Sequence, residues 1–443
     1  MNSWPARLVR WVVLALAAYL SFMLSAPRAS GQTVMSPEER EQHLKSFDFV
    51  WTAIRDRHYD STLGGLDWNA IREELRPRVE AAKDAATVRA ALRDMIGRLK
   101  LSHFQIIPGE VLREMARPPQ ENRLAGVTEI RVRVLEGAAI VTSVREGSPA
   151  AEAGVRPGWE ITRIDKQELR PLIEKVGKEF AGRSRRDLVL ADVAQGRLEG
   201  PAGGRVQVEF VDEGGVAREM DIPLAEERGG RLRVGLIDGV YTWIETRKLR
   251  GNVGYIAFNL FANPVYLMPA FQDALQTFRN TDGLVIDLRG NTGGMLDVAL
   301  GMAGWLVAER GHNLGTLILR DARLKAVVKP RQWTYGGPLA LLVDGGTVCG
   351  GEVFAVGLQE LGRARVFGTR TAGIVQGGLI EELPNGDGFM FAVGDYESAQ
   401  GKRIEGVGMA PDVEVAHRRE ALLEGRDLPL EAALEWIERE GGK

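Results

Sequence analysis

Hydrophobic and polar residues alternate with different periods in successive parts of this chain. Between residues 36 and 110, apolar residues recur every three to four positions in three segments, which predicts amphipathic helices. The first segment opens with Ser36, Pro37 and two glutamates, a combination typical of a helix N-terminus. The pattern therefore predicts a helical region over residues 36–110.

Short runs of β-branched residues replace the helical pattern beyond residue 123. Glycine-containing turns at Gly137 and at Gly214–Gly215 separate such runs and indicate hairpins. A helical insertion followed by a glycine-rich loop interrupts the strands between residues 169 and 204. We expect a β-rich domain over residues 123–225.

From residue 230 to residue 443, apolar strand-like runs alternate with helical segments. The stretches "GLVIDLRGNTGG" and "LALLVDGG" each run from a strand into a glycine-rich turn, and a helical pattern follows each. Repeated strand–turn–helix units predict an α/β fold with a mostly parallel sheet and helices on its faces. Ligands in such folds bind at the carboxyl ends of the strands, so both turns are candidate sites.

The N-terminal segment has the composition of an export signal. Arg7 and Arg10 precede the apolar stretch "WVVLALAAYLSFMLSA", and small residues follow it. We expect residues 1–31 to be a signal peptide and the mature chain to be exported, in a bacterial periplasm. A retained anchor is the alternative, and membrane contact would then be limited to this segment.

Charge and motif content argue against several classes of function. The net charge of −3 gives no electrostatic reason to propose nucleic acid as a partner. The sequence contains no HExxH motif, no CxxC motif and no histidine pair at ligand spacing, so we expect no metal. It also contains no P-loop and no GxGxxG fingerprint, and we expect no cofactor.

The single cysteine, Cys349, lies at the second glycine-rich turn, just before a predicted helix. A helix N-terminus stabilises a thiolate, so we expect a lowered pKa for a cysteine in this place. The N–H of Gly350 is a candidate oxyanion donor, and Glu352 is interpreted as a partner of the helix dipole. The alternative for a lone cysteine is a small buried apolar residue.

Among the five histidines, His103 differs from the others. It follows Ser102 at the end of the helical region and precedes the apolar "FQIIP", whereas the other four lie among polar residues and are expected at the surface. A partly buried structural histidine is the alternative interpretation. Further along, we expect Asp287 to pair with Arg289.

The order of the motifs resembles the C-terminal processing peptidases and the related tricorn-core group. The matching stretches are "LDW", "LSHF", a PDZ-like segment, "DLRGNTGG", "GGTVCGGE" and "IEGVGMAPDVEV", and they span nearly all of the mature chain. The resemblance implies a ClpP/crotonase-like α/β core sheet, a helical N-terminal region and an inserted PDZ-like β domain.

The resemblance also implies site residues. In the processing-peptidase branch a serine acts with a lysine, but this chain has no lysine between Lys329 and Lys402, which excludes that pair. In the tricorn-like branch a serine acts with a histidine that a serine and a glutamate orient. The matching positions are Cys349 as nucleophile, His103 as base, and Ser102 and Glu405 as the orienting residues.

The oxyanion donors implied by this match are Gly350 and either Gly293 or Gly294. A cysteine replaces the family's serine, and a Cys–His pair is a competent combination for acyl transfer. The PDZ-like segment implies capture of a peptide C-terminus as an added strand.

The resulting hypothesis is an exported endopeptidase acting on peptides or on unfolded C-terminal regions of proteins. The alternatives are a non-catalytic peptide or apolar-ligand binder on the same fold, and a hydrolase of esters or thioesters. The sequence leaves the oligomeric state open.

Overall fold

The computed structural model describes residues 35–116 and 125–441. The predicted signal segment lies outside the described residues. No helix within the described ranges has the length and apolar character needed to cross a membrane. The prediction of an α/β fold is confirmed.

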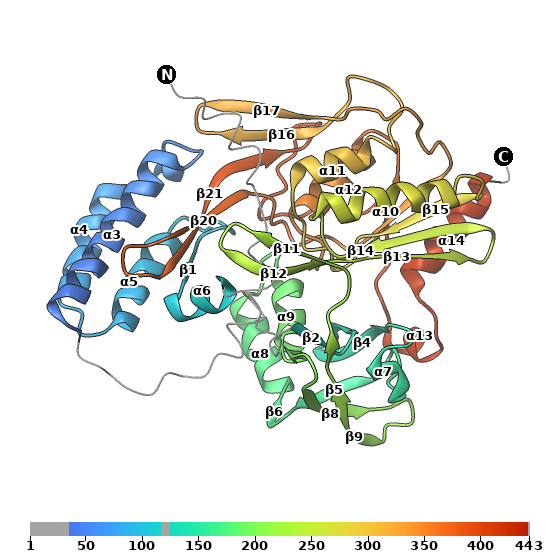
Figure 1. Ribbon diagram of the computed structural model, residues 1–443, viewed down its shortest axis with the longest axis horizontal. Helices are drawn as coiled ribbons and strands as arrows, with labels where there is room; N and C mark the ends of the chain where they lie inside the picture. The colour runs from blue at the N-terminus through green and yellow to red at the C-terminus, as the bar shows by residue number, and fades with distance from the viewer. Residues whose placement is uncertain (1–34, 117–124, 442–443) are drawn as a thin grey trace.

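The N-terminal region consists of three helices that pack on one another through a shared apolar core (Figure 1). The Ser36 hydroxyl accepts the Glu39 N–H, and the Glu39 carboxylate accepts the Ser36 N–H, so a reciprocal cap begins the first helix as predicted. The helices are α3 (Pro37–Arg57), α4 (Trp68–Glu80) and α5 (Ala85–Gly97), with a short 3₁₀ turn η1 (Leu63–Gly65) between the first two.

The C-terminal core contains a six-stranded sheet in which every neighbouring pair is parallel except the first. The strand order is β13 (Ile244–Leu249), β14 (Val253–Phe258), β15 (Gly283–Asp287), β18 (Leu339–Val343), β19 (Arg365–Gly368) and β22 (Val413–Glu414). Apolar residues of β14, β15 and β18 are buried on both faces, as expected for a parallel sheet covered by helices.

Helices cover the two faces of this sheet (Figure 1). One face packs against α10 (Pro264–Thr277), α11 (Leu296–Ala303) and α12 (Gly350–Glu360), and the other packs against α14 (Leu428–Gly441). Arg289 donates hydrogen bonds to Asp287 and to Asp427, so the expected Asp287–Arg289 pair is present and also ties the start of α14 to the end of β15.

A second sheet joins the helical region to the core, and the sequence pattern did not predict it. Its order is β1 (Gln105–Ile107), β21 (Gly388–Glu397), β16 (Asn313–Leu319) and β17 (Ala322–Val327), with β20 (Gly377–Glu382) also paired to β21. All its pairs are antiparallel. Because β1 directly follows the "LSHF" stretch, its pairing with β21 brings the end of the helical region to the core.

Residues 130–224 form a separate antiparallel sheet with its own apolar core, called here the β-domain. Its strands are β3 (Ile130–Leu135), β4 (Ala138–Val144), β5 (Glu160–Ile164), β6 (Gln167–Glu168), β8 (Arg205–Val211) and β9 (Ala217–Pro223). Its helices are α7 (Pro149–Glu152), α8 (Arg170–Glu179) and α9 (Arg186–Gln195). The predicted insertion between residues 169 and 204 thus contains two helices.

Short elements complete the fold. They are α6 (Gly109–Ala116), α13 (Arg419–Leu423), the hairpin β11 (Gly230–Val234) with β12 (Ile237–Thr242), and the small sheet of β10 (Ala225–Glu226), β2 (Ala125–Val127) and β7 (Glu199–Pro201). The β-domain is attached to the core by Arg133, which pairs with Asp344 in the turn after β18 at 2.7 Å.

Candidate active site

Cys349 lies at a strained turn between strand β18 and helix α12. Its backbone has φ 52° and ψ −120°, a left-handed conformation that residues other than glycine rarely adopt. The strained backbone is held from both sides, because the Cys349 N–H donates to the Ile374 carbonyl at 2.8 Å and to the Glu352 carboxylate at 3.2 Å. Nucleophiles of α/β hydrolases occupy similar strand-to-helix turns.

Two backbone N–H groups are directed at the Cys349 thiol, and they belong to Gly294 and Gly350. The Gly293 N–H is already used, since it donates to Asn291 Oδ1 at 3.0 Å. Gly293 instead provides space, because a Cβ added there would lie 2.5 Å from the Cys349 Cβ. The sequence left Gly293 and Gly294 as alternatives for the second oxyanion donor. Of these two, it is the Gly294 N–H that points at the thiol.

Ser102, His103 and Glu405 are brought together by hydrogen bonds. The Ser102 hydroxyl lies 2.8 Å from His103 Nδ1, and the Ser102 N–H donates to Glu405 at 3.1 Å. The Ser102 hydroxyl also bonds to the Glu405 carboxylate. The other carboxylate oxygen accepts the Val375 N–H at 3.0 Å. Glu405 is thus connected to the imidazole through Ser102.

This arrangement determines the tautomer of the imidazole. An ionised carboxylate only accepts, so the Ser102 hydroxyl donates to Glu405 and accepts from the His103 Nδ1–H. The Nε2 atom then carries the lone pair that a general base needs. Burial raises the pKa of Glu405 above its usual value, while the hydrogen bonds from Val375 and Ser102 lower it.

The His103 ring is buried and neutral. Burial, together with the positive charge of Arg185, lowers its pKa to about 4. The ring packs against β20, where a Cβ added to Gly378 would be 2.9 Å from His103 Cδ2. Glycine at this position is what admits the imidazole.

The expectation that the helix N-terminus lowers the pKa of Cys349 is wrong. Although the residue keeps some exposure, burial raises the thiol pKa to about 11, and the N–H groups of Gly294 and Gly350 oppose this only in part. Neighbouring carboxylates of Glu352 and Glu405 add to the increase. The desolvation cost of a thiolate exceeds the gain from the helix terminus, so thiol and imidazole are both neutral at pH 7.

No hydrogen bond joins Cys349 Sγ to the His103 imidazole within the described residues. Their connection runs through one peptide unit, since Ile374 accepts the Cys349 N–H and Val375 donates to Glu405. Catalytic hydrogen bonds are often long in ligand-free enzymes and shorten when substrate binds.

Glu352 does more than complement the helix dipole. It is completely buried and accepts from the Thr371 hydroxyl, from the Gly373 and Ile374 N–H groups, and from Cys349. Burial raises its pKa to about 7. This carboxylate therefore fixes the loop of residues 371–374 against the turn at Cys349.

The surface position expected for the other histidines is wrong for three of them. The His417 side chain is only 11% exposed, and burial lowers its pKa to about 4. His43 and His58 are buried, and His58 packs its ring on Tyr59 and Phe104. His43 lies in α3 and His58 caps its end. Polar residues next to both histidines in the sequence led to the wrong prediction. Neither contacts Cys349.

Sequence reasoning missed two residues that the β-domain places beside Cys349 and His103. Leu188 of α9 packs with Val348, Ala372 and Ile374 around Cys349. Arg185, at the start of the same helix, exerts its charge on His103 and Glu405. The only sequence signal was the arginine cluster in "GRSRRD", which can equally be a solvated surface.

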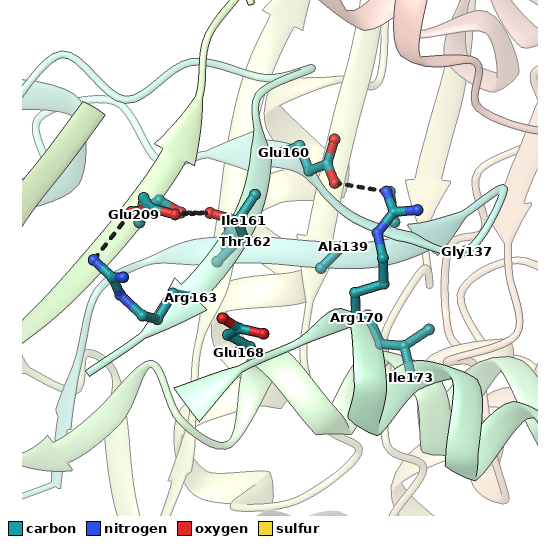
Figure 2. A pocket seen from close by; sticks show the side chains of 11 residues that line it. Gly137, Ala139, Glu160, Ile161, Thr162, Arg163, Glu168, Arg170, Ile173 and Glu209 are labelled. Carbon is teal, nitrogen blue, oxygen red and sulfur yellow. Dashed lines mark hydrogen bonds and ion pairs between the residues drawn. The ribbon is translucent and has the colours of Figure 1, made fainter. Parts of the chain in front are cut away.

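Other places in the described residues are weaker candidates for a site. A small polar cavity of about 160 Å³ lies within the β-domain, between β5 and α8 (Figure 2). Its charged groups largely satisfy one another, because Arg170 pairs with Glu160 and Arg163 pairs with Glu209. Over the described ranges, the His, Cys, Asp and Glu side chains form no group of three or more that could hold a metal ion.

Comparison with known proteins agrees with this geometry. Residues 252–415 match the peptidase family S41, and residues 37–97 match the tricorn protease C1 domain. The chain is 24% identical over 416 residues to carboxyl-terminal-processing peptidase 3, chloroplastic, of Arabidopsis thaliana, covering 90% of this chain and 75% of the relative. It is 25% identical to putative tricorn protease homolog 2 of Streptomyces coelicolor, covering 89% of this chain and 32% of the relative.

A solved structure shares the fold. The photosystem II D1 C-terminal processing protease superposes with a TM-score of 0.57 at 21% identity, covering 89% of this chain and 97% of that protein. The resemblance to C-terminal processing and tricorn-type peptidases is thereby confirmed, and the matched domains support a hydrolase of the peptidase class.

Proposed function

We propose that this chain, which carries a peptidase family S41 domain, is an exported endopeptidase with Cys349 as nucleophile and His103 as general base. The observation that supports this most is the hydrogen-bonded series Glu405–Ser102–His103, which leaves Nε2 as a proton acceptor. The missing lysine and the change of nucleophile motivated the non-catalytic alternative. In the proposal, His103 takes the role of the lysine. Neither that alternative nor the ester hydrolase gains a specific observation.

The proposed reaction begins from a neutral pair. The substrate carbonyl oxygen accepts hydrogen bonds from the Gly294 and Gly350 N–H groups, and Sγ attacks the carbonyl carbon as Nε2 takes the thiol proton. The imidazolium then donates this proton to the departing amine, which leaves a thioester on Cys349. Water, activated by the neutral imidazole, hydrolyses the thioester and restores the thiol.

Ser102 and Glu405 hold the ring and stabilise the positive charge that His103 acquires during the reaction. Because the resting thiol is protonated, the reaction follows the general-base logic of a serine peptidase rather than that of a preformed thiolate. Replacement of serine by cysteine then requires no change in the rest of the relay.

The substrate class follows from the relatives and is part of the proposal. We expect cleavage of peptides or unfolded segments near protein C-termini. In the β-domain, which we propose to be PDZ-like, the free edge of β3 is the place where a peptide C-terminus would add as a strand. In this structure the Gln195 carboxamide occupies that edge, accepting the Val132 N–H at 3.2 Å and donating to the Ile130 carbonyl at 3.0 Å.

Export is proposed from the composition of residues 1–31 alone. Expression of the full chain in a Gram-negative host, followed by fractionation and N-terminal sequencing, tests it. A periplasmic product that begins near residue 32 supports export by a cleaved signal. A cytoplasmic product with an intact N-terminus contradicts it.

Assays with fluorescently labelled casein test the peptidase proposal. Cys349→Ala and His103→Ala should both abolish turnover, because each removes one partner of the proton transfer. The exposed His312 provides the matched control, and His312→Ala should keep full activity. Full activity in Cys349→Ala would exclude the proposed nucleophile, and activity in none of the proteins, on casein and on a random peptide library, would favour the binding alternative.

A further inference from the structure

Arg185 is a cation beside the candidate active site that lacks an anionic partner. In the part of the chain that the structure describes, its guanidinium makes no hydrogen bond and no ion pair, and it lies over the Phe180 ring at 5.5 Å. Arginines at the turns after β15 and β18 are paired, by contrast: Arg133 pairs with Asp344, and Arg289 pairs with Asp287 and Asp427. A guanidinium has a planar set of N–H donors suited to a carboxylate, and those of Arg185 are free to bind one.

A second cation increases the positive charge at this position. The Arg183 guanidinium lies over the same Phe180 ring at 5.3 Å, and it too has no anionic partner among the described residues. The two like charges disfavour one another, as the lowered pKa of Arg185 reflects after the larger contribution of burial. An arriving anion would relieve this repulsion.

The segment that carries both arginines forms a wall of the active site. Leu188 packs around Cys349. Ser184 contacts the loop that Glu352 fixes, since a Cβ on Gly373 would lie 2.9 Å from its hydroxyl oxygen. The charge of Arg185 acts on His103, and the charge of Glu405 acts on Arg185. Any peptide bound at Cys349 therefore lies close to this pair of cations.

The edge of β3, where a peptide would add as a strand to a PDZ-like domain, is closed here. The Gln195 carboxamide already occupies the backbone groups of Ile130 and Val132 that an added strand would use. Gln195 ends the same helix, α9, that Arg185 precedes. Arg185 is therefore at the end of α9 opposite to Gln195, on the side of Cys349.

We propose that Arg185, assisted by Arg183, binds a carboxylate of the substrate next to the scissile peptide bond and so makes this site selective for carboxylate-bearing peptides. This deepens the proposed function, and it rests on Cys349 marking the place of cleavage. The carboxylate comes either from the C-terminus of the peptide or from an Asp or Glu side chain.

Equilibrium retention of random hexapeptides by the Cys349→Ala protein tests the proposal without requiring turnover. Two libraries are compared by mass spectrometry, one with free C-terminal carboxylates and one with C-terminal amides. We expect free acids to be retained about ten- to hundredfold better than amides, the range for hydrogen bonds to charged groups. If the carboxylate is a side chain, retained amides are instead enriched in Asp and Glu.

Variants of the arginines test whether Arg185 causes the selectivity. Arg185→Gln should remove the enrichment, Arg185→Lys should keep part of it, and Arg183→Gln should reduce it less. Arg186→Gln is the matched control, because the Arg186 guanidinium already contacts the Gly177 carbonyl and Asp187, and it should retain the enrichment. Circular dichroism confirms that each variant is folded.

The proposal is wrong if acids and amides are retained equally without Asp or Glu enrichment, if no peptide is retained, or if the enrichment survives in Arg185→Gln. Failure of the proposed function has a different signature. A wild-type protein that binds free acids selectively but cleaves no peptide would contradict the peptidase proposal and leave the carboxylate site in place.

Discussion

The Ser102 hydroxyl lies 2.8 Å from His103 Nδ1 and also bonds to the Glu405 carboxylate. A single side chain thus transmits the orientation of the carboxylate to the imidazole. Since Ser102 and His103 are adjacent in sequence, one turn before β1 supplies both the proposed base and its proposed orienting group. Glu405 comes from a distant loop that the Val375 N–H holds in place.

Removal of the Ser102 hydroxyl should therefore impair catalysis without loss of the fold. In Ser102→Ala the Nδ1–H loses its acceptor and the ring loses its orientation. We expect kcat to fall about 10- to 100-fold, the usual cost of an orienting partner, with KM nearly unchanged. Ser102→Thr retains a hydroxyl and should keep more activity than Ser102→Ala. Equal activity in Ser102→Ala and wild type would show that the bridge has no catalytic role.

The protonation states of the pair predict a specific pH dependence. His103, with a pKa near 4, is a neutral base above that pH, so kcat/KM should stay level from about pH 5 to 8 and fall as pH approaches 4. The Cys349 thiol, with a pKa near 11, should react slowly with iodoacetamide at pH 7, and its rate should rise about tenfold per pH unit towards 11. Fast, pH-independent alkylation between pH 5 and 7 would instead indicate a thiolate–imidazolium pair.

A neutral pair also predicts how an oxygen nucleophile behaves. Cys349→Ser should retain measurable turnover, because His103 can take a proton from a hydroxyl as it does from a thiol, whereas Cys349→Ala should have none. The comparison is made on fluorescent casein with both proteins at equal concentration. If Cys349→Ser is as inactive as Cys349→Ala, the reaction depends on a property of sulfur that a general-base description does not contain.

Gly378 should be essential for the position of the base. Gly378→Ala places a methyl group 2.9 Å from His103 Cδ2, inside normal contact distance, so the ring must move. We expect a loss of about 10-fold or more in kcat/KM, since small displacements in active sites are costly. Gly336→Ala is the matched control, because nothing lies within 4 Å of a Cβ there. Comparable activity in both variants would mean that the observed ring position is not the catalytic one.

Glu352 should be required for stability. Glu352→Ala removes the acceptor of several buried donors, and each unsatisfied group costs about 1–3 kcal/mol, so we expect the free energy of unfolding to fall by about 3 kcal/mol or more. Denaturant unfolding measures this, with the exposed Glu174→Ala as control. A change within about 0.5 kcal/mol, the usual range for surface substitutions, would contradict the structural role of Glu352.

Opening the edge of β3, which Gln195 closes, should increase the affinity for peptides rather than decrease it. Gln195→Ala frees the Val132 N–H and the Ile130 carbonyl for an added strand. With the Arg185→Gln change also present, to remove the second carboxylate site, Gln195→Ala should increase the affinity for peptides with free C-termini. Unchanged affinity would indicate that this β-domain does not take up strands even when its edge is open.

The sequence predicted the parts of the fold and site that local patterns encode. Periodicity identified the helical region and the parallel strands, and the turn before α12 was expected at Cys349 because an apolar run meets glycines there. Family motifs supplied Ser102, His103 and Glu405. By contrast, the antiparallel sheet that carries β1 to β21 joins segments almost 300 residues apart, and no local pattern encodes such pairing.

The pKa values and charges at the site were harder to predict than the positions of its residues. The pKa of Cys349 depends on desolvation by Leu188, Ala372 and Ile374, of which the first comes from the β-domain. A lone cysteine at a helix start suggests a lowered pKa only if its surroundings are ignored. Arg185 could not be assigned for the same reason, because its relation to His103 exists only after α9 packs against the core.

The proposed reaction requires a covalent thioester at Cys349. The most direct test is to quench the wild-type protein with acid during turnover of a peptide mixture and to measure the mass of the tryptic fragment that contains Cys349. We predict an acyl adduct on this fragment that hydroxylamine removes and that is absent in Cys349→Ala. Turnover without any adduct on Cys349, at a rate that Cys349→Ala matches, would contradict the account.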